Sequence, residues 1–198
     1  MALLPRRYFE RYVEEVARGL VGVEIHLGGV TLRITETEAY GGPEDSASHA
    51  RFGHTERNAP MWGPAGCVYV YLCYGIHNML NFVTGPRGAA GAVLIRSCEP
   101  IEGIELIRER RGERAGTELL AGPGRVGEAL GLDVGWSHHD ACAGGGLEVH
   151  EGEPPKRLFV GSRVGVNFAE KHDRDKQRRF ADGATTWISQ SNGLIEGP

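Results

Sequence analysis

Two carboxylates and a phenol alternate in the segment RITETEAY, residues 33–40. Successive side chains of a strand point to opposite faces, so Glu36, Glu38 and Tyr40 would share one face. A carboxylate beside an aromatic ring could act as a general base next to a surface on which a flat substrate stacks. Both glutamates could equally be solvated strand residues, and this segment alone leaves the two interpretations open.

Tyrosines recur in CVYVYLCYG, residues 67–75. Tyr69 and Tyr71 would share one face of a strand, although the same alternation is typical of ordinary sheet packing. Tyr74 stands at the expected turn before Gly75, where a large ring stays exposed unless something covers it. Proteins that distort duplexes insert apolar wedges between base steps, and Tyr74 is a candidate for such a wedge.

Two polar residues interrupt apolar strand segments: Arg96 in AVLIRSC and Asn81 in MLNFV. An arginine is rarely buried without a partner, and Glu36 or Glu38 is the natural candidate here. Such a pair could be purely structural. Asparagine is depleted in strands, so Asn81 either lines a pocket or lies on the surface of the sheet.

Residues 41–66 form a long segment rich in Gly, Pro, Ser and Asn, and connections of this length in a compact domain are often functional. His49 lies in this segment, where a lone histidine is most often simply solvated. Arg51, Arg57 and Asn58 follow it, and we expect them to form a strip that faces phosphate groups, although a solvated loop would carry the same residues.

The composition narrows the class of protein. A chain of 198 residues corresponds to one domain, and its 30 glycines indicate many turns and short strands rather than a helical bundle. It holds no apolar run of the roughly 18 residues that a membrane helix needs. Its four cysteines do not have the spacing of metal ligands, so we expect no metal and no cofactor, and a cytoplasmic protein.

The charge is informative in two ways. A net charge of −4 argues against a broadly basic nucleic-acid protein, although residues 161–180 carry six Lys or Arg against three acids and could form a local basic face. Lysine occurs only three times, against 19 arginines, so the chain has few candidates for an amine nucleophile.

Periodicity and turn signals predict the elements that position these residues. A Gly28-Gly29 pair between β-rich runs indicates a hairpin, and the run at 92–98 is apolar enough for a central strand. We expect a mixed α/β (α+β) fold, as a single domain over 1–198 with a curved antiparallel or mixed sheet, flanking helices and a protruding tyrosine hairpin. The other predicted elements are a helix over 6–19, strands over 67–73 and 79–83, a helix that starts at Pro100, two short helical pieces around AGPG, and short strands or irregular segments in LEVHE, RLFVGSRVGVN and TTWIS.

These motifs, in this order, resemble the alkyladenine (3-methyladenine) DNA glycosylases. The resemblance is strongest over residues 33–103, from RITETEAYGGPEDSASHARFG to AVLIRSCEPIEG, and continues more weakly through RVGVNFAE to RFADGATTWIS. It implies an enzyme that flips a damaged purine out of duplex DNA and hydrolyses its N-glycosidic bond with water, as a monofunctional glycosylase without a lyase step. The partner would be duplex DNA that contains alkylated, deaminated or etheno purines, bound by a monomer at the nucleoid, with no membrane.

The resemblance also implies roles for single residues. Glu38 would be the general base that activates water, and Arg96 would hold that water and the carboxylate. Tyr74 would fill the gap left in the base stack. The base pocket would be walled and floored by Tyr40, His49, Tyr71 and Asn81.

Two alternatives of other classes remain at this point. A non-catalytic nucleic-acid-binding domain could use the tyrosine hairpin and an arginine face. A small-molecule glycoside or nucleoside hydrolase could use Glu36 and Glu38, but side chains two residues apart on a strand lie about 7 Å from each other, whereas a retaining hydrolase needs about 5 Å.

Overall fold

The computed structural model describes residues 1–197, built on one nine-stranded sheet. Its strands are β1 (Glu24–Leu27), β2 (Val30–Tyr40), β3 (Val68–Cys73), β4 (His77–Thr84), β5 (Gly91–Glu102), β6 (Glu148–His150), β7 (Leu158–Gly161), β8 (Arg179–Asp182) and β9 (Leu194–Glu196). The order is β3-β4-β5-β2-β8-β7-β9, with β1 pairing β2 and β6, and the strand pairs are antiparallel.

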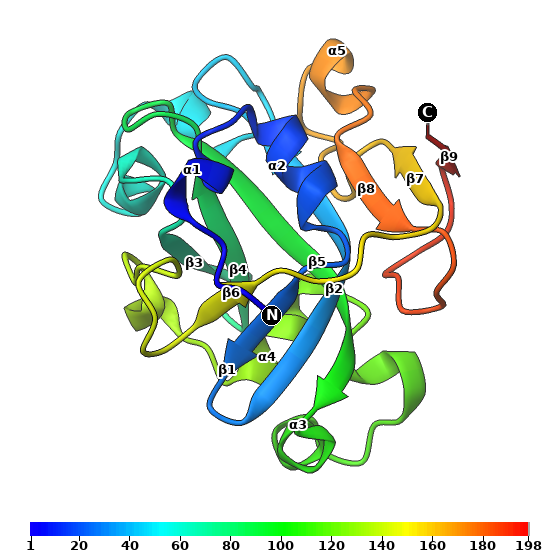
Figure 1. Ribbon diagram of the computed structural model, residues 1–198. Helices are drawn as coiled ribbons and strands as arrows, with labels where there is room; N and C mark the ends of the chain where they lie inside the picture. Colours follow the sequence, from blue (N-terminus) through cyan, green and yellow to red (C-terminus); the bar gives the residue numbers. More distant parts are fainter. Residues whose placement is uncertain (198) are drawn as a thin grey trace.

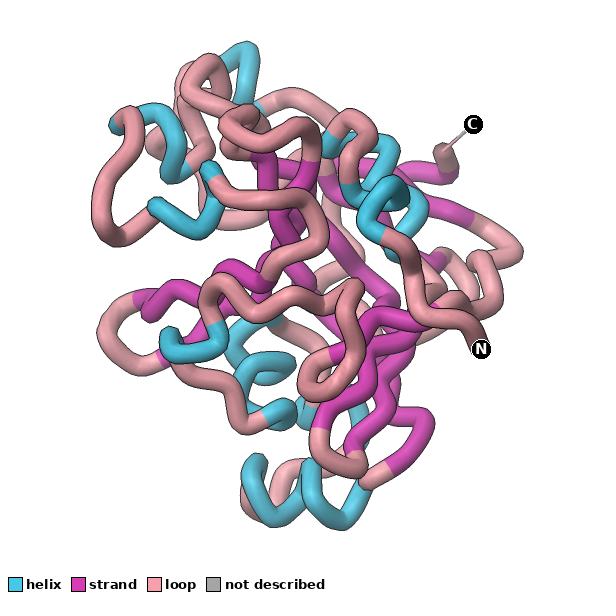
Figure 2. Tube along the Cα trace, turned by 60° about the vertical axis from the view of Figure 1, so that its left-hand side comes forward, coloured by secondary structure: helices cyan, strands magenta, loops and turns pink. Residues whose placement is uncertain are grey.

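Short helices cover this sheet. Figure 1 shows α1 and α2 in front of the sheet and α4 behind it, and Figure 2 shows the strands gathered in the middle of the molecule. The predicted mixed α/β fold with flanking helices is therefore confirmed. No helix within residues 1–197 has the length and apolar character needed to cross a membrane. The α-helices are α1 (Arg6–Phe9), α2 (Val13–Leu20), α3 (Ile104–Arg111), α4 (Pro123–Leu130) and α5 (Lys171–Arg174).

Both predicted hairpins form. Gly28 and Gly29 join β1 to β2 with φ of +55° and +82°, which only glycine adopts without strain. The long strands β2 and β5 lie next to each other in the middle of the sheet, as the apolar run of β5 indicated. On the α2 side, the hydroxyl of Thr37 donates to the carbonyl of Ala17 over 2.8 Å, so the face of β2 opposite to Glu38 is covered as well.

The predicted helix over 6–19 is wrong in its continuity, because the chain breaks between α1 and α2. The amide of Gly85 donates to the carbonyl of Phe9 over 2.9 Å, which takes that carbonyl out of a continuing helix. Phe9 is fully buried and packs against Phe82, with ring centroids 5.8 Å apart. Tertiary packing of one aromatic residue therefore overrides the helical periodicity.

The predicted helix start at Pro100 is also wrong. Pro100 lies in β5 opposite Leu32, next to a register shift, where a missing amide hydrogen is tolerated. Helix α3 starts only after Gly103, whose φ is +79° and whose Cβ position would lie 2.4 Å from the carbonyl oxygen of Gly29. Strands β8 and β9 were not predicted, and TTWIS is irregular.

Candidate active site

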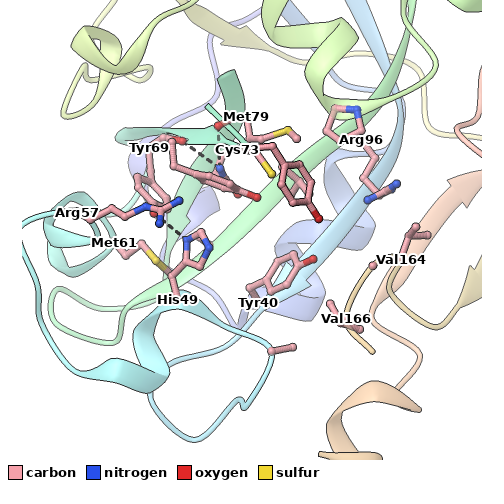
Figure 3. A pocket seen from close by; sticks show the side chains of 18 of the residues that line it. Tyr40, His49, Arg57, Met61, Tyr69, Cys73, Met79, Arg96, Val164 and Val166 are labelled. Atoms are coloured by element: carbon pink, nitrogen blue, oxygen red, sulfur yellow. Dashed lines mark hydrogen bonds between the residues drawn. The ribbon is translucent and has the colours of Figure 1, made fainter. Parts of the chain in front are cut away.

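A pocket of about 510 Å³ opens between the tyrosine hairpin and two loops (Figure 3). Its walls come from five parts of the chain: the end of β2, the segment 47–61, the hairpin and strands from β3 to β5, the start of α4 at Pro123, and the loop after β7. The sequence-predicted residues that line it are Tyr40, His49, Arg57, Tyr71, Tyr74, Asn81 and Arg96. The residues that sequence patterns singled out on separate segments therefore meet around one cavity.

Glu38 lies directly behind the wall of this pocket. Its side chain is fully buried, and its Oε1 accepts a hydrogen bond of 2.7 Å from the amide of Val164. Its Oε2 accepts one of 2.8 Å from the hydroxyl of Tyr40 and lies 3.3 Å from Nη1 of Arg96. Those three neighbours line the pocket, so they separate the carboxylate from the cavity.

Burial raises the pKa of Glu38, because a charge without solvent is disfavoured. The Arg96 guanidinium, the Val164 amide and the Tyr40 hydroxyl all oppose this shift, since each stabilises the ionised form. The pKa of Glu38 is nevertheless raised overall. A carboxyl group of this kind accepts a proton more readily than a solvated glutamate does, which is the property of a general base.

Two register shifts interrupt the pairing of β2 with β5 beside Glu36. Ile34 pairs with Cys98 and Glu36 with Ser97, which leaves Thr35 as the extra residue on β2. Thr37 then pairs with Ile95, which leaves Arg96 as the extra residue on β5. Arg96 keeps the face of Ala92 and Leu94, which also line the pocket, whereas the shift places Ser97 opposite Glu36, where its hydroxyl donates to the carboxylate.

Arg96 contacts both predicted glutamates. Its Nε lies 3.5 Å from Oε1 of Glu36, in addition to its contact with Glu38, and its Nε and Nη2 donate to Oγ of Ser189. Only 7% of the residue is exposed. The expectation that Glu36 or Glu38 is the partner of a buried Arg96 is confirmed, and both are.

Glu36 has a different environment, although periodicity put it on the same face as Glu38. Its two oxygens accept hydrogen bonds from the hydroxyl of Ser97 and from the amide and hydroxyl of Ser189. Arg179 approaches it to 3.4 Å. Glu36 is fully buried and does not line the pocket, so these neighbours, rather than a substrate, satisfy its carboxylate.

A buried ion pair supports the Tyr40 side of the pocket. Arg163 binds Asp45 through two hydrogen bonds of 2.6 and 2.8 Å, and neither side chain is exposed. The Arg163 guanidinium lies 4.8 Å from the centre of the Tyr40 ring, and it also donates to the carbonyl of Ala39. Arg163 therefore fixes the loop whose next residue, Val164, binds Glu38.

The opposite wall consists of aromatic rings. The His49 ring stands edge-on to Tyr71 with centroids 4.6 Å apart, and its Nδ1 pairs with the hydroxyl of Tyr69 over 2.9 Å, which Figure 3 shows as a dashed line. Burial, with Arg57 and Arg51 nearby, lowers the pKa of His49 to about 4. The ring is therefore neutral at physiological pH, so this wall carries no histidine charge.

Asn81 lies on the pocket floor and is 3% exposed. Its Nδ2 donates to the carbonyls of Tyr69 and Met79 over 3.1 and 3.0 Å. Both amide hydrogens are thus held by the hairpin itself, which fixes the orientation of the side chain.

Tyr74 stands at the hairpin tip with 92% of its surface exposed. It has φ of +52°, a left-handed conformation that is uncommon for a tyrosine, and the turn closes with a 3.1 Å hydrogen bond from the amide of Ile76 to the carbonyl of Cys73. Leu72 and Ile76 beside it are 43% and 72% exposed. The tip is therefore an uncovered apolar projection at the edge of the pocket.

The predicted phosphate-facing strip needs a correction. Asn58 is only 2% exposed, and its side chain holds the loop together instead of facing outward. Its partners are the amide of Thr55, the carbonyls of His49 and Gly53, and Nε1 of Trp62. Arg57 is exposed, and Arg51 lies between two phenylalanine rings.

The segment 161–180 does not present the basic face that its composition allowed. Arg163 and Arg179 are buried, and Arg178 binds Asp45 and Glu14. The other three cations, Lys171, Arg174 and Lys176, pair with Asp173 or Asp175. Most positive charges of this segment therefore form ion pairs within the protein.

Sequence patterns missed the contributions of Val164, Arg163, Asp45 and Ser189. Val164 acts through its backbone amide, which any residue carries, so no side-chain signal could reveal it. The pairing of Arg163 with Asp45 joins two distant loops and becomes visible only in the fold.

Comparison with known proteins agrees with this geometry. The family model described as methylpurine-DNA glycosylase (MPG) matches residues 7–185. A DNA-3-methyladenine glycosylase of Arabidopsis thaliana is 49% identical over 198 residues, covering 99% of this chain and 78% of its own. A protein of Nitrosococcus oceani, provisionally named 3-methyladenine DNA glycosylase, is 52% identical over 187 residues, covering 94% of this chain and 93% of its own. The chain belongs to the methylpurine-DNA glycosylase family.

Proposed function

We propose that this DNA N-glycosylase flips an alkylated purine out of duplex DNA into the aromatic pocket and hydrolyses its N-glycosidic bond with water activated by Glu38. The observation that carries the proposal is the contact of a buried carboxylate with Arg96, Tyr40 and Val164, three groups that line the pocket. The reaction releases the free base and leaves an abasic site, and it needs no amine nucleophile and no lyase step.

The pocket suits a cationic base. Purines methylated at N3 or N7 carry a positive charge, and a cation against an aromatic face gains roughly 0.5–2 kcal/mol that a neutral base does not. The rings of Tyr40 and Tyr71 supply such faces, and neutral His49 adds no repulsion. The charged purine is also a ready leaving group. Deaminated and etheno purines are neutral and gain less from the same wall.

Glu38 has the capacity for the proton transfer. Each carboxylate oxygen can accept two hydrogen bonds, and Oε1 holds only the one from Val164 within residues 1–197. Because Glu38 has no exposed surface, the attacking water must enter between Tyr40, Arg96 and Val164. The ionised carboxylate then takes the water proton and stabilises the positive charge that develops on the sugar.

Tyr74 would lower the free-energy cost of base flipping. Extruding a nucleotide costs about a few kcal/mol of unstacking, least where damage has already weakened the pair. An exposed ring at the hairpin tip can occupy the vacated space and offset part of that cost.

The test is Glu38→Gln on a duplex that contains 7-methylguanine, with the released base quantified by chromatography. We expect excision to fall by about 10³-fold or more, since a general base and an electrostatic stabiliser are both removed. Glu56→Gln, on an exposed loop, should excise at the wild-type rate. Excision by Glu38→Gln close to the wild-type rate would contradict the assignment, and binding without any base release by the wild type would favour a non-catalytic DNA-binding domain.

A further inference from the structure

Arg51 and two phenylalanines form a three-layer stack that the proposed reaction does not use. The Cζ atom of Arg51 lies 4.1 Å from the ring centre of Phe52 and 4.6 Å from that of Phe168. Phe52 belongs to the short 3-10 helix His49–Phe52, whereas Phe168 lies in the loop between β7 and α5. We call these three residues the Phe–Arg–Phe stack.

The stack borders the pocket through Phe168. Phe168 lines the cavity together with Val164 and Val166, and Arg51 follows the pocket residue His49 by two residues. Tyr74 lines the same cavity from the hairpin. The pocket is therefore bordered by exposed aromatic residues from two separate parts of the fold.

Both phenyl rings stay in solvent, although burial of a phenylalanine is strongly favoured. Phe52 is 67% exposed and Phe168 is 62% exposed. Apolar groups left uncovered beside a functional pocket commonly mark a binding surface. Arg51 is the cation–π partner of both rings, and their exposed surface remains available to a ligand.

The guanidinium edge adds a complementary polar group. Nη1 of Arg51 donates to the carbonyl of Ser48 over 3.2 Å, and no other hydrogen bond of this side chain occurs within residues 1–197. Its remaining N–H groups can therefore reach a phosphate, the anion whose geometry arginine matches best. One stack thus offers apolar ring faces for a sugar or base and a cationic edge for the adjoining phosphate.

The charged neighbours of the Phe–Arg–Phe stack restrict the direction from which DNA can approach it. A recess on one side of Arg51 and Phe52 is lined by Glu44, Glu170 and Asp173, whose negative charges disfavour DNA there. The pocket side presents no acidic side chain among its described lining residues. Arg51 and Phe52 border this acidic recess, whereas Phe168 borders the pocket, so the side of the stack that faces the pocket is the one on which acidic groups do not oppose a phosphate.

We propose that the Phe–Arg–Phe stack is a second DNA contact, which holds the sugar and phosphate of a nucleotide next to the flipped one. This inference rests on the proposed function, because it takes the pocket as the place where a nucleotide of duplex DNA enters. It assigns to Phe52 and Phe168 a role in affinity for DNA that is separate from the wedge role of Tyr74.

The test measures binding to a duplex that contains a tetrahydrofuran abasic-site analogue, which has no base to excise. Fluorescence anisotropy at several salt concentrations gives Kd and its salt dependence. We expect Phe52→Ala and Phe168→Ala each to raise Kd by about 5- to 10-fold without changing the slope of log Kd against log salt. Arg51→Gln should raise Kd and reduce that slope by about 1, since one phosphate contact is lost.

Two further variants keep the result interpretable. Ile101→Ala, on a 50% exposed residue near the far end of β5 from the pocket residues Ala92 and Leu94, should bind like the wild type. Phe52→Leu tests the ring itself with little change in apolar character, and it should weaken binding as well. Thermal melting verifies that each variant is folded.

Wild-type Kd values for both phenylalanine variants would overturn the proposal. So would an unchanged Kd accompanied by a lower melting temperature, because the stack would then only join two loops. The probe cannot be cleaved, so this outcome does not depend on catalysis. A failure of the proposed reaction would appear instead in the base-release assay with Glu38→Gln.

Discussion

Nη1 of Arg96 lies 3.3 Å from Oε2 of Glu38, although the two residues belong to different strands and Arg96 is the extra residue of a β-bulge. Arg96 follows Leu94, the partner of Glu38 on β5, by two residues, so the alternation of β5 places the Arg96 side chain on the same face as Glu38. The contact opposes the rise in the Glu38 pKa that burial causes. The register of β2 and β5 and the proton affinity of Glu38 are thus linked through one contact.

The pH dependence of excision should report this environment. Because the pKa of Glu38 is raised, kcat/KM on 7-methylguanine duplex should fall with decreasing pH at a higher pH than a solvated glutamate would give. Tyr40→Phe removes a hydrogen bond that stabilises the ionised form, so the inflection should move to still higher pH. Tyr69→Phe, whose hydroxyl pairs with His49 instead, should leave it in place. An unmoved inflection in Tyr40→Phe would contradict the assignment of Glu38.

Removing the hairpin wedge should affect only duplex substrates. Tyr74 is 92% exposed, so Tyr74→Asn, which tolerates the left-handed backbone, should not change the melting temperature. Excision from duplex should fall by about 10- to 100-fold, since the ring no longer offsets unstacking. Excision from a single-stranded oligonucleotide should be unaffected. Equal losses on both substrates would argue against a wedge.

The buried pair of Arg163 and Asp45 should stabilise both the fold and the pocket. Arg163→Met leaves a buried carboxylate without its main partner, and we expect the free energy of unfolding to fall by about 3–5 kcal/mol in denaturant titrations. Arg163→Lys keeps the charge but loses the bidentate geometry, so its loss should be smaller. A negligible change in Arg163→Met would show that solvent replaces the pair.

The contribution of the Arg163–Asp45 pair to the stability of the fold should also depend on pH. Although burial acts in the opposite direction, hydrogen bonds from Arg163 and the Gly41 amide hold the pKa of Asp45 below its usual value. A lowered carboxyl pKa stabilises the fold above the unfolded-state value of about 4. This contribution is lost as pH falls from there through the folded value. Asp45→Asn should remove that part of the acid sensitivity, and its persistence would count against the pair.

His49 should titrate near pH 4 in the folded protein, which NMR of its Cε1–H resonance can measure. Burial is the main cause, and the positive charge of Arg57 adds to it, so Arg57→Gln should raise the value. Stability should decrease as pH falls from about 6.5, the unfolded-state pKa, toward 4, because the unfolded chain binds the proton more tightly. A His49 pKa near 6.5 would contradict its burial.

Variants of Asn58 and Arg57 should distinguish a structural role of this segment from a DNA-facing role. Asn58→Ala leaves several buried groups unpaired, and we expect it to lower the free energy of unfolding by about 1–3 kcal/mol. Arg57→Gln, on an exposed residue, should leave stability unchanged and reduce the salt dependence of DNA binding by about one unit of slope. Weaker DNA binding by Asn58→Ala with an unchanged free energy of unfolding would restore its predicted phosphate contact.

Local patterns predicted the hairpins and the central strands, because turn chemistry and alternation act over a few residues. They failed at Phe9 and Pro100, where a backbone hydrogen bond to Gly85 and a register shift beside Leu32 override local preference. Strand β8 was missed because its four residues become a strand only by pairing with β2 and β7.

By itself, the sequence determined which side chains could perform the chemistry and that the Tyr74 hairpin would carry an exposed ring. The alternation of residues along the strand could not distinguish Glu36 from Glu38. The tertiary structure distinguished them, because Ser97 and Ser189 occupy the oxygens of Glu36, whereas Glu38 meets groups that line the pocket. Bulges and loop contacts depend on residues far apart in the chain, and no local pattern encodes them.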